Sequence, residues 1–272
     1  MKNINWLWRI ILIFIVIGLI ILSFKCGTEK SLDEYTTIFN NNTFEIVEKY
    51  PGILDITYKL NDTGVVLIVN NSSDRLKEYK YILDAHESNT ISLTEGAGTY
   101  SIKLHNVKSD GNSTGIITKT FENIEVILNK EDENSVFNKN TTLVNFKDNT
   151  EIIDEVFKDT NDVDEIYVYF ENMGYNYELA DKISSGIITE YTVNISDTIR
   201  EQRGICYDIA TSMTAVLRYK GYKAQMVYGY VNNTYHAWVN VLLDGQWISY
   251  DPTIGKTSYD SNMSIYKIDE YH

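Results

Sequence analysis

The sequence predicts an α+β protein with three parts: an apolar N-terminal helix, a small all-β domain and a larger mixed domain. Three observations predict this organisation. An apolar run covers residues 10–24, short segments rich in β-branched and aromatic residues lie between residues 53 and 128, and the second half combines helical stripes with a hairpin signal. We expect a membrane anchor at 1–27, a tether at 28–43 that could instead be an edge element, a β-sandwich-like domain at 44–130 and the mixed domain at 131–272.

The length and charge of the chain limit its class and its partners. A chain of 272 residues is long enough for two ordinary domains without disulfide staples. Lys and Arg total 24 against 38 for Asp and Glu, a formal net charge of −14. A surface of that sign repels phosphate backbones, so we expect no nucleic acid partner. The two cysteines, Cys26 and Cys206, lie far apart, which predicts that Cys206 is a free thiol.

The apolar run at 10–24 predicts a single transmembrane helix. Extended back to Ile4, the run is long enough to span a bilayer at about 1.5 Å per residue. No small-residue cleavage site follows, which favours an uncleaved signal anchor. Lys2 and Arg9 precede the run and favour a cytoplasmic N-terminus, so we expect the bulk of the chain to be extracytoplasmic.

Cys26 leaves a second kind of anchor open. It follows the apolar run closely, as the lipidated cysteine of a bacterial lipoprotein does. Phe24 and Lys25 stand where that processing needs small residues, so a juxtamembrane cysteine without a lipid is the favoured interpretation.

The next part of the chain is typical of a small β-sandwich. Tyr100, Ile102 and Leu104 alternate with polar residues, the period of a half-buried strand. Turn-rich clusters separate the segments. The segments expected as strands are 53–60, 65–69, 78–83, 98–107 and 121–128.

Two histidines of this region, His86 and His105, have no companions at the spacing of metal ligands. We therefore expect both to be surface residues and expect no metal and no cofactor.

The mixed domain begins after a polar, mostly acidic stretch at 129–134, which is typical of a domain boundary. Val163, Ile166, Tyr167 and Phe170 then recur at the spacing of one helix face, and we interpret them as core residues.

Cys206 stands at the start of a second helix. Ile209, Met213 and Val216 fall on one helical stripe, and Gly221 is placed to end the helix. Free N–H groups and the positive end of the helix dipole stabilise a thiolate at such a position. They can also help to hold an oxyanion.

An Asp-Gly pair at 244–245 predicts a two-residue hairpin between strands at 236–243 and 246–251. In that register Leu243 faces Gln246, and Asp251 lies diagonal to His236 on one face of the sheet. An Asp and a His side chain can close that gap with a hydrogen bond. The sequence therefore predicts an imidazole and carboxylate pair.

A thiol, an imidazole and a carboxylate are the groups that make a cysteine nucleophilic. A single buried cysteine or strand histidine is more often structural than catalytic. Their combination in Cys206, His236 and Asp251 favours acyl-transfer chemistry.

The same residues resemble the transglutaminase-like superfamily. A further segment at 175–180 resembles the stretch before the cysteine in extracytoplasmic bacterial members, and 96–100 gives weaker support for an accompanying β-domain. The runs that carry the resemblance are 203–210, 216–224, 227–230, 236–239 and 251–253.

The resemblance implies a papain-like α+β core in which Cys206 is the nucleophile, His236 the general base and acid, and Asp251 the residue that orients His236. Gly204, Tyr207 and Trp238 would line or support the substrate groove. No side-chain donor for the oxyanion is evident from the sequence.

We therefore expect a membrane-anchored, exterior-facing enzyme that forms a cysteine thioester with protein or peptide amides at the cell surface or cell wall. An amine acceptor would make it an acyltransferase, and water would make it a deamidase or cysteine protease. The alternative is a catalytically inactive surface module that binds a partner.

Overall fold

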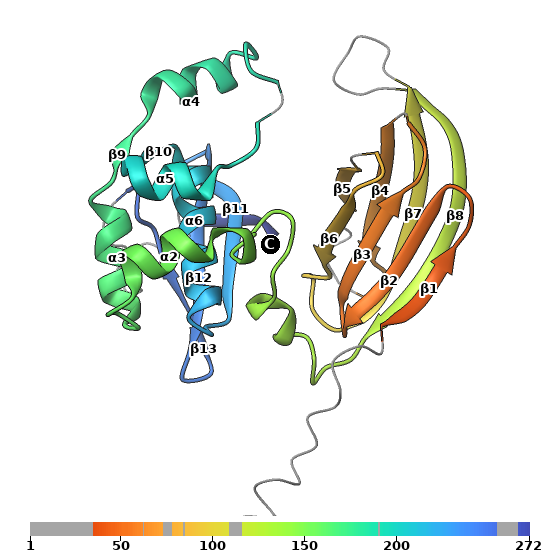
Figure 1. Ribbon diagram of the computed structural model, residues 1–272, viewed down its shortest axis with the longest axis horizontal. Coiled ribbons are helices and arrows are strands. Elements are labelled where there is room, and N and C mark those ends of the chain that lie inside the picture. The colour runs from red at the N-terminus through yellow and green to blue at the C-terminus, as the bar shows by residue number, and fades with distance from the viewer. Residues whose placement is uncertain are drawn as a thin grey trace, which may run out of the picture. The chain divides into compact units, whose positions relative to one another are not determined.

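The computed structural model describes residues 35–61, 63–72, 78–83, 85–108, 116–189, 191–254 and 266–272 (Figure 1). The expected transmembrane helix and Cys26 lie outside these residues. No helix within the described ranges is both long and apolar enough to cross a membrane. Residues 36–272 form one compact unit.

Two four-stranded antiparallel sheets make up the first half of this unit, as the alternating segments predicted (Figure 1). Buried side chains of both sheets, such as Ile56 and Ile102, belong to one hydrophobic cluster, so the two sheets form a sandwich. One sheet has the order β1 (Thr36–Asn40), β2 (Phe44–Tyr50), β3 (Ile53–Tyr58), β6 (Ser88–Ser92), and the other β5 (Glu78–Leu83), β4 (Thr63–Asn70), β7 (Gly98–Lys108), β8 (Ile116–Leu128).

One expectation for this region needs correction, and one alternative is decided. Residues 36–40, expected in a tether or an edge element, form edge strand β1, because Ile38 and Phe39 pack against the sandwich core. His105 was expected at the surface but is buried. It lies on β7, a strand paired on both sides, and its Nδ1 is 3.0 Å from Oγ1 of Thr120 on β8.

The second half of the unit is a layer of helices packed on a four-stranded antiparallel sheet of order β13-β12-β11-β14. A separate two-stranded parallel sheet joins β9 to β10. The elements are η1 (Ser135–Asn138), η2 (Lys147–Asn149), α2 (Thr150–Phe157), α3 (Val163–Glu171), β9 (Gly174–Tyr175), α4 (Tyr177–Ser184), α5 (Ile195–Glu201), β10 (Arg203–Gly204), α6 (Cys206–Tyr219), β11 (Ala224–Val231), β12 (Thr234–Leu243), β13 (Gln246–Tyr250) and β14 (Tyr266–Tyr271).

Helix α6 is the centre of this half. Every residue from Asp208 to Arg218 is buried, because α6 contacts β11 and β12 as well as α2, α3 and α5 (Figure 1). Gly221 follows its C-terminus with φ +90°, the left-handed conformation that glycine adopts without strain. The helix therefore holds its first residue, Cys206, on a rigid support.

The hairpin of β12 and β13 has the predicted register. Leu243 pairs with Gln246, and Val239 pairs with Tyr250. Asp244 and Gly245 have φ of 49° and 80°, as a type I′ turn requires. This register brings Asp251, just after β13, beside the strand that carries His236.

Candidate functional site

Cys206 is the first residue of α6, and a side chain from the first turn fixes that start. Oδ2 of Asp208 accepts the backbone N–H of Ile205 at 2.9 Å, and Oδ1 accepts the Tyr191 hydroxyl at 2.9 Å. A Cβ at Gly204 would lie only 2.7 Å from Cβ of Asp208. Gly204 therefore supports the site by leaving room for this capping carboxylate.

His236 and Asp251 form the imidazole and carboxylate pair that the hairpin predicts. Nε2 of His236 lies 2.8 Å from Oδ2 of Asp251, whose side chain is fully buried. Oδ1 of Asp251 accepts the N–H and hydroxyl of Thr253 and the N–H of Ile254, at 3.0–3.2 Å. The Tyr266 hydroxyl donates to Oδ2 at 3.0 Å. A carboxylate with five donors is held in one orientation and stays ionised.

Trp238 lies behind His236. The two rings are stacked with centroids 6.3 Å apart, and Trp238 is 0% exposed in a cluster with Val227 and Val231. A fully buried ring does not line an open groove. Of the two roles expected for Trp238, this position is consistent with support of the His236 ring.

The Cys206 thiol interacts with the His236 ring, and both groups are shifted toward their charged forms. Burial alone would raise the pKa of Cys206, but hydrogen bonding and charge from His236, together with the Ala237 N–H and Tyr175, bring it below its usual value. Burial alone would lower the pKa of His236, but Asp251 and Cys206 raise it to about 9. Because Nε2 of His236 binds Asp251, Nδ1 is the nitrogen left for the thiol. The pair favours a thiolate beside an imidazolium.

Asp251 completes this charge arrangement. Burial alone would raise its pKa, but hydrogen bonds from His236 and Thr253 and the His236 charge bring that pKa below its usual value. Cys206, His236 and Asp251 therefore lie in contact order, and each pKa shift favours the charged form of its group. Such an arrangement can activate a cysteine and its base.

The region that holds these three residues also matches a known protein family. Residues 149–252 match the family model described as Transglut_core, transglutaminase-like superfamily. This segment is a transglutaminase-like domain. It contains Cys206, His236 and Asp251, and it ends before β14. No curated protein matches the chain.

Solved structures show only distant likeness to this chain. A proposed cysteine protease from Cytophaga hutchinsonii has 15% identity and a TM-score of 0.41, over 88% of this chain and 83% of its own. The periplasmic domain of TgpA from Pseudomonas aeruginosa, bound to ethylmercury, has 14% identity and a TM-score of 0.34, over 71% and 90%. A protein named only as a TGase has 20% identity and a TM-score of 0.31, over 54% and 44%.

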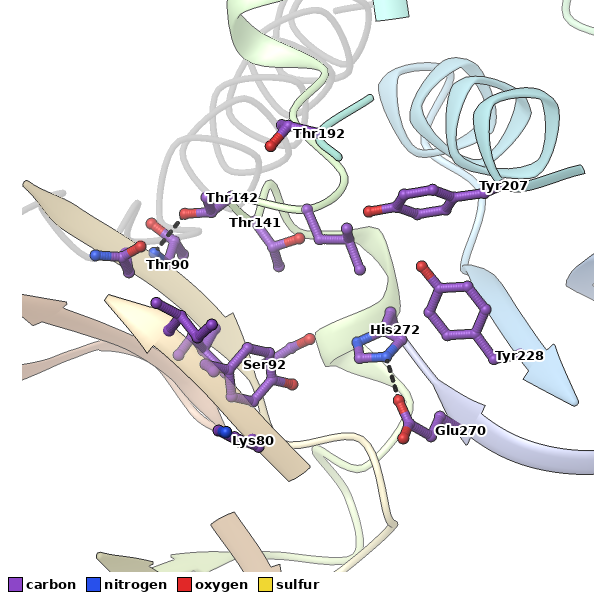
Figure 2. Close-up of a pocket in the computed structure, with 15 residues that line it drawn as sticks. Lys80, Thr90, Ser92, Thr141, Thr142, Thr192, Tyr207, Tyr228, Glu270 and His272 are labelled. Carbon is purple, nitrogen blue, oxygen red and sulfur yellow. Dashed lines mark hydrogen bonds and ion pairs between the residues drawn. The ribbon is translucent and has the colours of Figure 1, made fainter. Parts of the chain in front are cut away.

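Tyr207, the residue that follows Cys206, lines a pocket of about 400 Å³. Figure 2 shows its hydroxyl pointing toward that of Tyr228, with which it interacts. Strands β5 and β6 of the sandwich form another wall (Figure 2). Glu270 and His272, two residues apart, also line the pocket, and Nε2 of His272 lies 3.1 Å from Oε2 of Glu270. The volume is in the range of small-ligand sites.

Two residues of the site were missed from the sequence. Tyr175 interacts with Cys206 because β9 pairs with β10, which places Tyr175 opposite Gly204. Residues 175–180 are part of the family resemblance, and that resemblance was the one feature of the sequence that could have identified Tyr175 as a site residue. Tyr266 reaches Asp251 from β14, where no motif marked it.

The described residues of the transglutaminase-like domain and the sandwich contain no cluster of His, Cys, Asp and Glu that could hold a metal ion.

Proposed function

We propose that this chain is a membrane-anchored, exterior-facing cysteine acyltransferase or hydrolase that acts on protein or peptide amides. The observation that carries the proposal is the contact of Cys206, at the start of α6, with a His236 ring held by buried Asp251. A module that only binds a partner has no need for a thiol with a lowered pKa beside such a pair.

In the first half of the proposed reaction, the Cys206 thiolate attacks the carbonyl carbon of a carboxamide. The C=O electrons move to oxygen and form an oxyanion. The His236 imidazolium gives its proton to the departing nitrogen, the C–N bond breaks, and a thioester remains on Cys206. Asp251 keeps His236 oriented and its positive charge stabilised during this step.

Tyr175 is the proposed side-chain donor for the oxyanion. Its hydroxyl interacts with Cys206, and β9 holds it beside β10. A donor beside the sulfur lies near the oxygen of a carbonyl that the sulfur attacks.

In the second half, neutral His236 takes a proton from the acceptor as the acceptor attacks the thioester. The C–S bond then breaks and the Cys206 thiolate leaves, with His236 again protonated. A primary amine gives an isopeptide bond, and water gives a free carboxylate. The pocket lined by Tyr207, the residue after Cys206, gives room for a substrate group.

The proposed location rests on the sequence. The apolar run at 10–24, with Lys2 and Arg9 before it, favours a single-pass membrane protein whose substrates are at the cell surface or cell wall. A membrane-impermeant maleimide applied to intact cells should modify Cys206. Labelling of Cys206 only after cell lysis would place the domain inside the cell.

The activity is tested by offering the full chain in detergent a glutamine-containing protein, with and without a fluorescent primary amine. Cys206→Ala is compared with Cys26→Ala, a matched control that removes the other cysteine. Amine incorporation lost only in Cys206→Ala identifies a transferase. Ammonia or peptide release in the reaction without the amine, again lost only in Cys206→Ala, identifies a hydrolase. Equal product with Cys206→Ala would contradict the proposal and favour a binding module.

A further inference from the structure

Tyr266 contacts the site from outside the segment that matches the family model. It begins β14, which pairs with β11 and places Tyr266 opposite Val231. Its hydroxyl donates to Oδ2 of Asp251 at 3.0 Å, and the same oxygen lies 2.8 Å from Nε2 of His236. Tyr266 and His236 therefore share one carboxylate oxygen.

Packing fixes the Tyr266 ring in that position. Its centroid lies 5.1 Å from that of Trp238, with the planes at 76°, and Trp238 in turn stacks on His236. The hydroxyl and the imidazole thus reach Asp251 from two rings that are held by the same fully buried tryptophan.

The two oxygens of Asp251 have different partners. Oδ1 accepts only from Thr253 and Ile254, within the turn that follows Asp251. Oδ2 accepts only side-chain donors from other elements among the described residues, namely Tyr266 and His236. Each hydrogen bond to a carboxylate reduces its attraction for a further proton or cation.

We propose that Tyr266 is a positioning residue that acts through Asp251, holding Oδ2 against His236 while limiting the negative charge that Oδ2 presents to the imidazolium. The proposal rests on the proposed function of Cys206 and His236. Its consequence is that His236 keeps its orientation yet still releases a proton to a departing amine.

The other titratable groups around this pair come from several elements. Cys206 of α6 faces His236, and Tyr167 of α3 reaches the Asp251 backbone carbonyl. Tyr175 of β9 and Tyr235 of β12 face the thiol rather than Asp251. Only Tyr266 shares Oδ2 with His236 among the described residues, so a change at Tyr266 tests the hydrogen bond to that oxygen.

The test is the pH profile of Cys206 alkylation by iodoacetamide in the full chain in detergent, measured by mass spectrometry on the tryptic fragment 204–218. An acid-side step reports formation of the thiolate and imidazolium pair. A second step on the alkaline side reports loss of the His236 proton, because a thiolate without its cationic partner is a stronger nucleophile.

Tyr266→Phe keeps the ring against Trp238 and removes the hydroxyl. We expect the alkaline step to move to higher pH by roughly 0.5 to 1 unit, since the freed Oδ2 holds the His236 proton more strongly. Tyr271→Phe, the same change on the same strand, should leave the step in place.

An alkaline step that stays in place, or moves to lower pH, in Tyr266→Phe would overturn the role of Tyr266 and leave the proposed function intact. A wild-type profile without an acid-side step would overturn the proposed function and this inference with it. A shift of equal size in Tyr271→Phe would assign the effect to β14 as a whole.

Discussion

Gly229 of β11 and Lys267 of β14 approach so closely that a Cβ at Gly229 would lie 2.2 Å from the Lys267 carbonyl oxygen. The same Cβ would lie 2.7 Å from the Trp238 ring. Gly229 thus allows β14 to pair next to the ring that supports His236. The strand that carries Tyr266 depends on a residue without a side chain.

Gly229→Ala should destabilise the protein, because neither a backbone carbonyl nor a fully buried tryptophan can move aside freely. We expect a loss of about 1–3 kcal/mol in the free energy of unfolding, measured by urea denaturation. Gly174→Ala is the control, since its Cβ would meet nothing closer than 3.7 Å. Equal stability of the two variants would show that β14 does not need this close approach.

Asp251→Asn should reduce turnover by about 10²–10⁴-fold, because a neutral amide cannot stabilise an imidazolium. In addition, the NH2 group of the Asn side chain would face hydrogen-bond donors at a position where Asp251 accepts five hydrogen bonds. The reduction should appear in kcat more than in KM, since Asp251 acts through His236. Thr253→Val removes only one of the donors and should cost less. Activity within twofold of wild type in Asp251→Asn would contradict the assigned role.

The raised pKa of His236, about 9, makes stability depend on pH in a definite direction. The folded pKa lies above the value of about 6.5 in an unfolded chain, so the protonated ring stabilises the folded state. This contribution is complete below about pH 6.5 and is lost as the pH rises through about 9.

The difference in unfolding free energy between wild type and His236→Gln should therefore be larger near about pH 6 than near about pH 10. Urea titrations at the two pH values measure it. A difference that is the same at both, or larger at the alkaline value, would show that the ring is not held as an imidazolium.

Arg218, near the end of α6, has a buried side chain. It donates hydrogen bonds to the backbone carbonyls of Ala224, Lys139 and His272 at 2.7–3.1 Å. Arg218→Met would remove the Arg218 donor from all three carbonyls, of which that of His272 keeps the Met226 N–H. We expect a loss of about 2–5 kcal/mol in thermal or urea unfolding. Arg200→Met is the matched control, because Arg200 is exposed and its loss should change stability by about 0.5 kcal/mol or less.

The parts of the fold that could be predicted are set by residue patterns within short segments of the chain. The alternation at Tyr100, Ile102 and Leu104 identifies β7, and the apolar stripe after Cys206 identifies α6. Asp244 and Gly245 set the hairpin register, because few residue pairs adopt two successive positive φ values. That register alone places Asp251 near His236.

The parts that were missed depend on contacts between distant segments. Strand β14 has only a short alternation, Tyr266 and Ile268 with Lys267 and Asp269, and its pairing with β11 is a long-range contact that sequence periodicity does not reveal. Strand β9 has only two residues, too few for a pattern. The helix N-cap is Ile205, so the polar cap that normally marks a helix start is absent and Asp208 does the capping from within α6.

The central claim is that His236 holds Cys206 as a thiolate near neutral pH. The most direct measurement is the rate of iodoacetamide alkylation of Cys206 against pH, in wild type and in His236→Asn. The account predicts a wild-type thiol that titrates well below the usual value of about 8.5 and a variant thiol that titrates close to it. The same titration near 8.5 in both proteins would contradict the account.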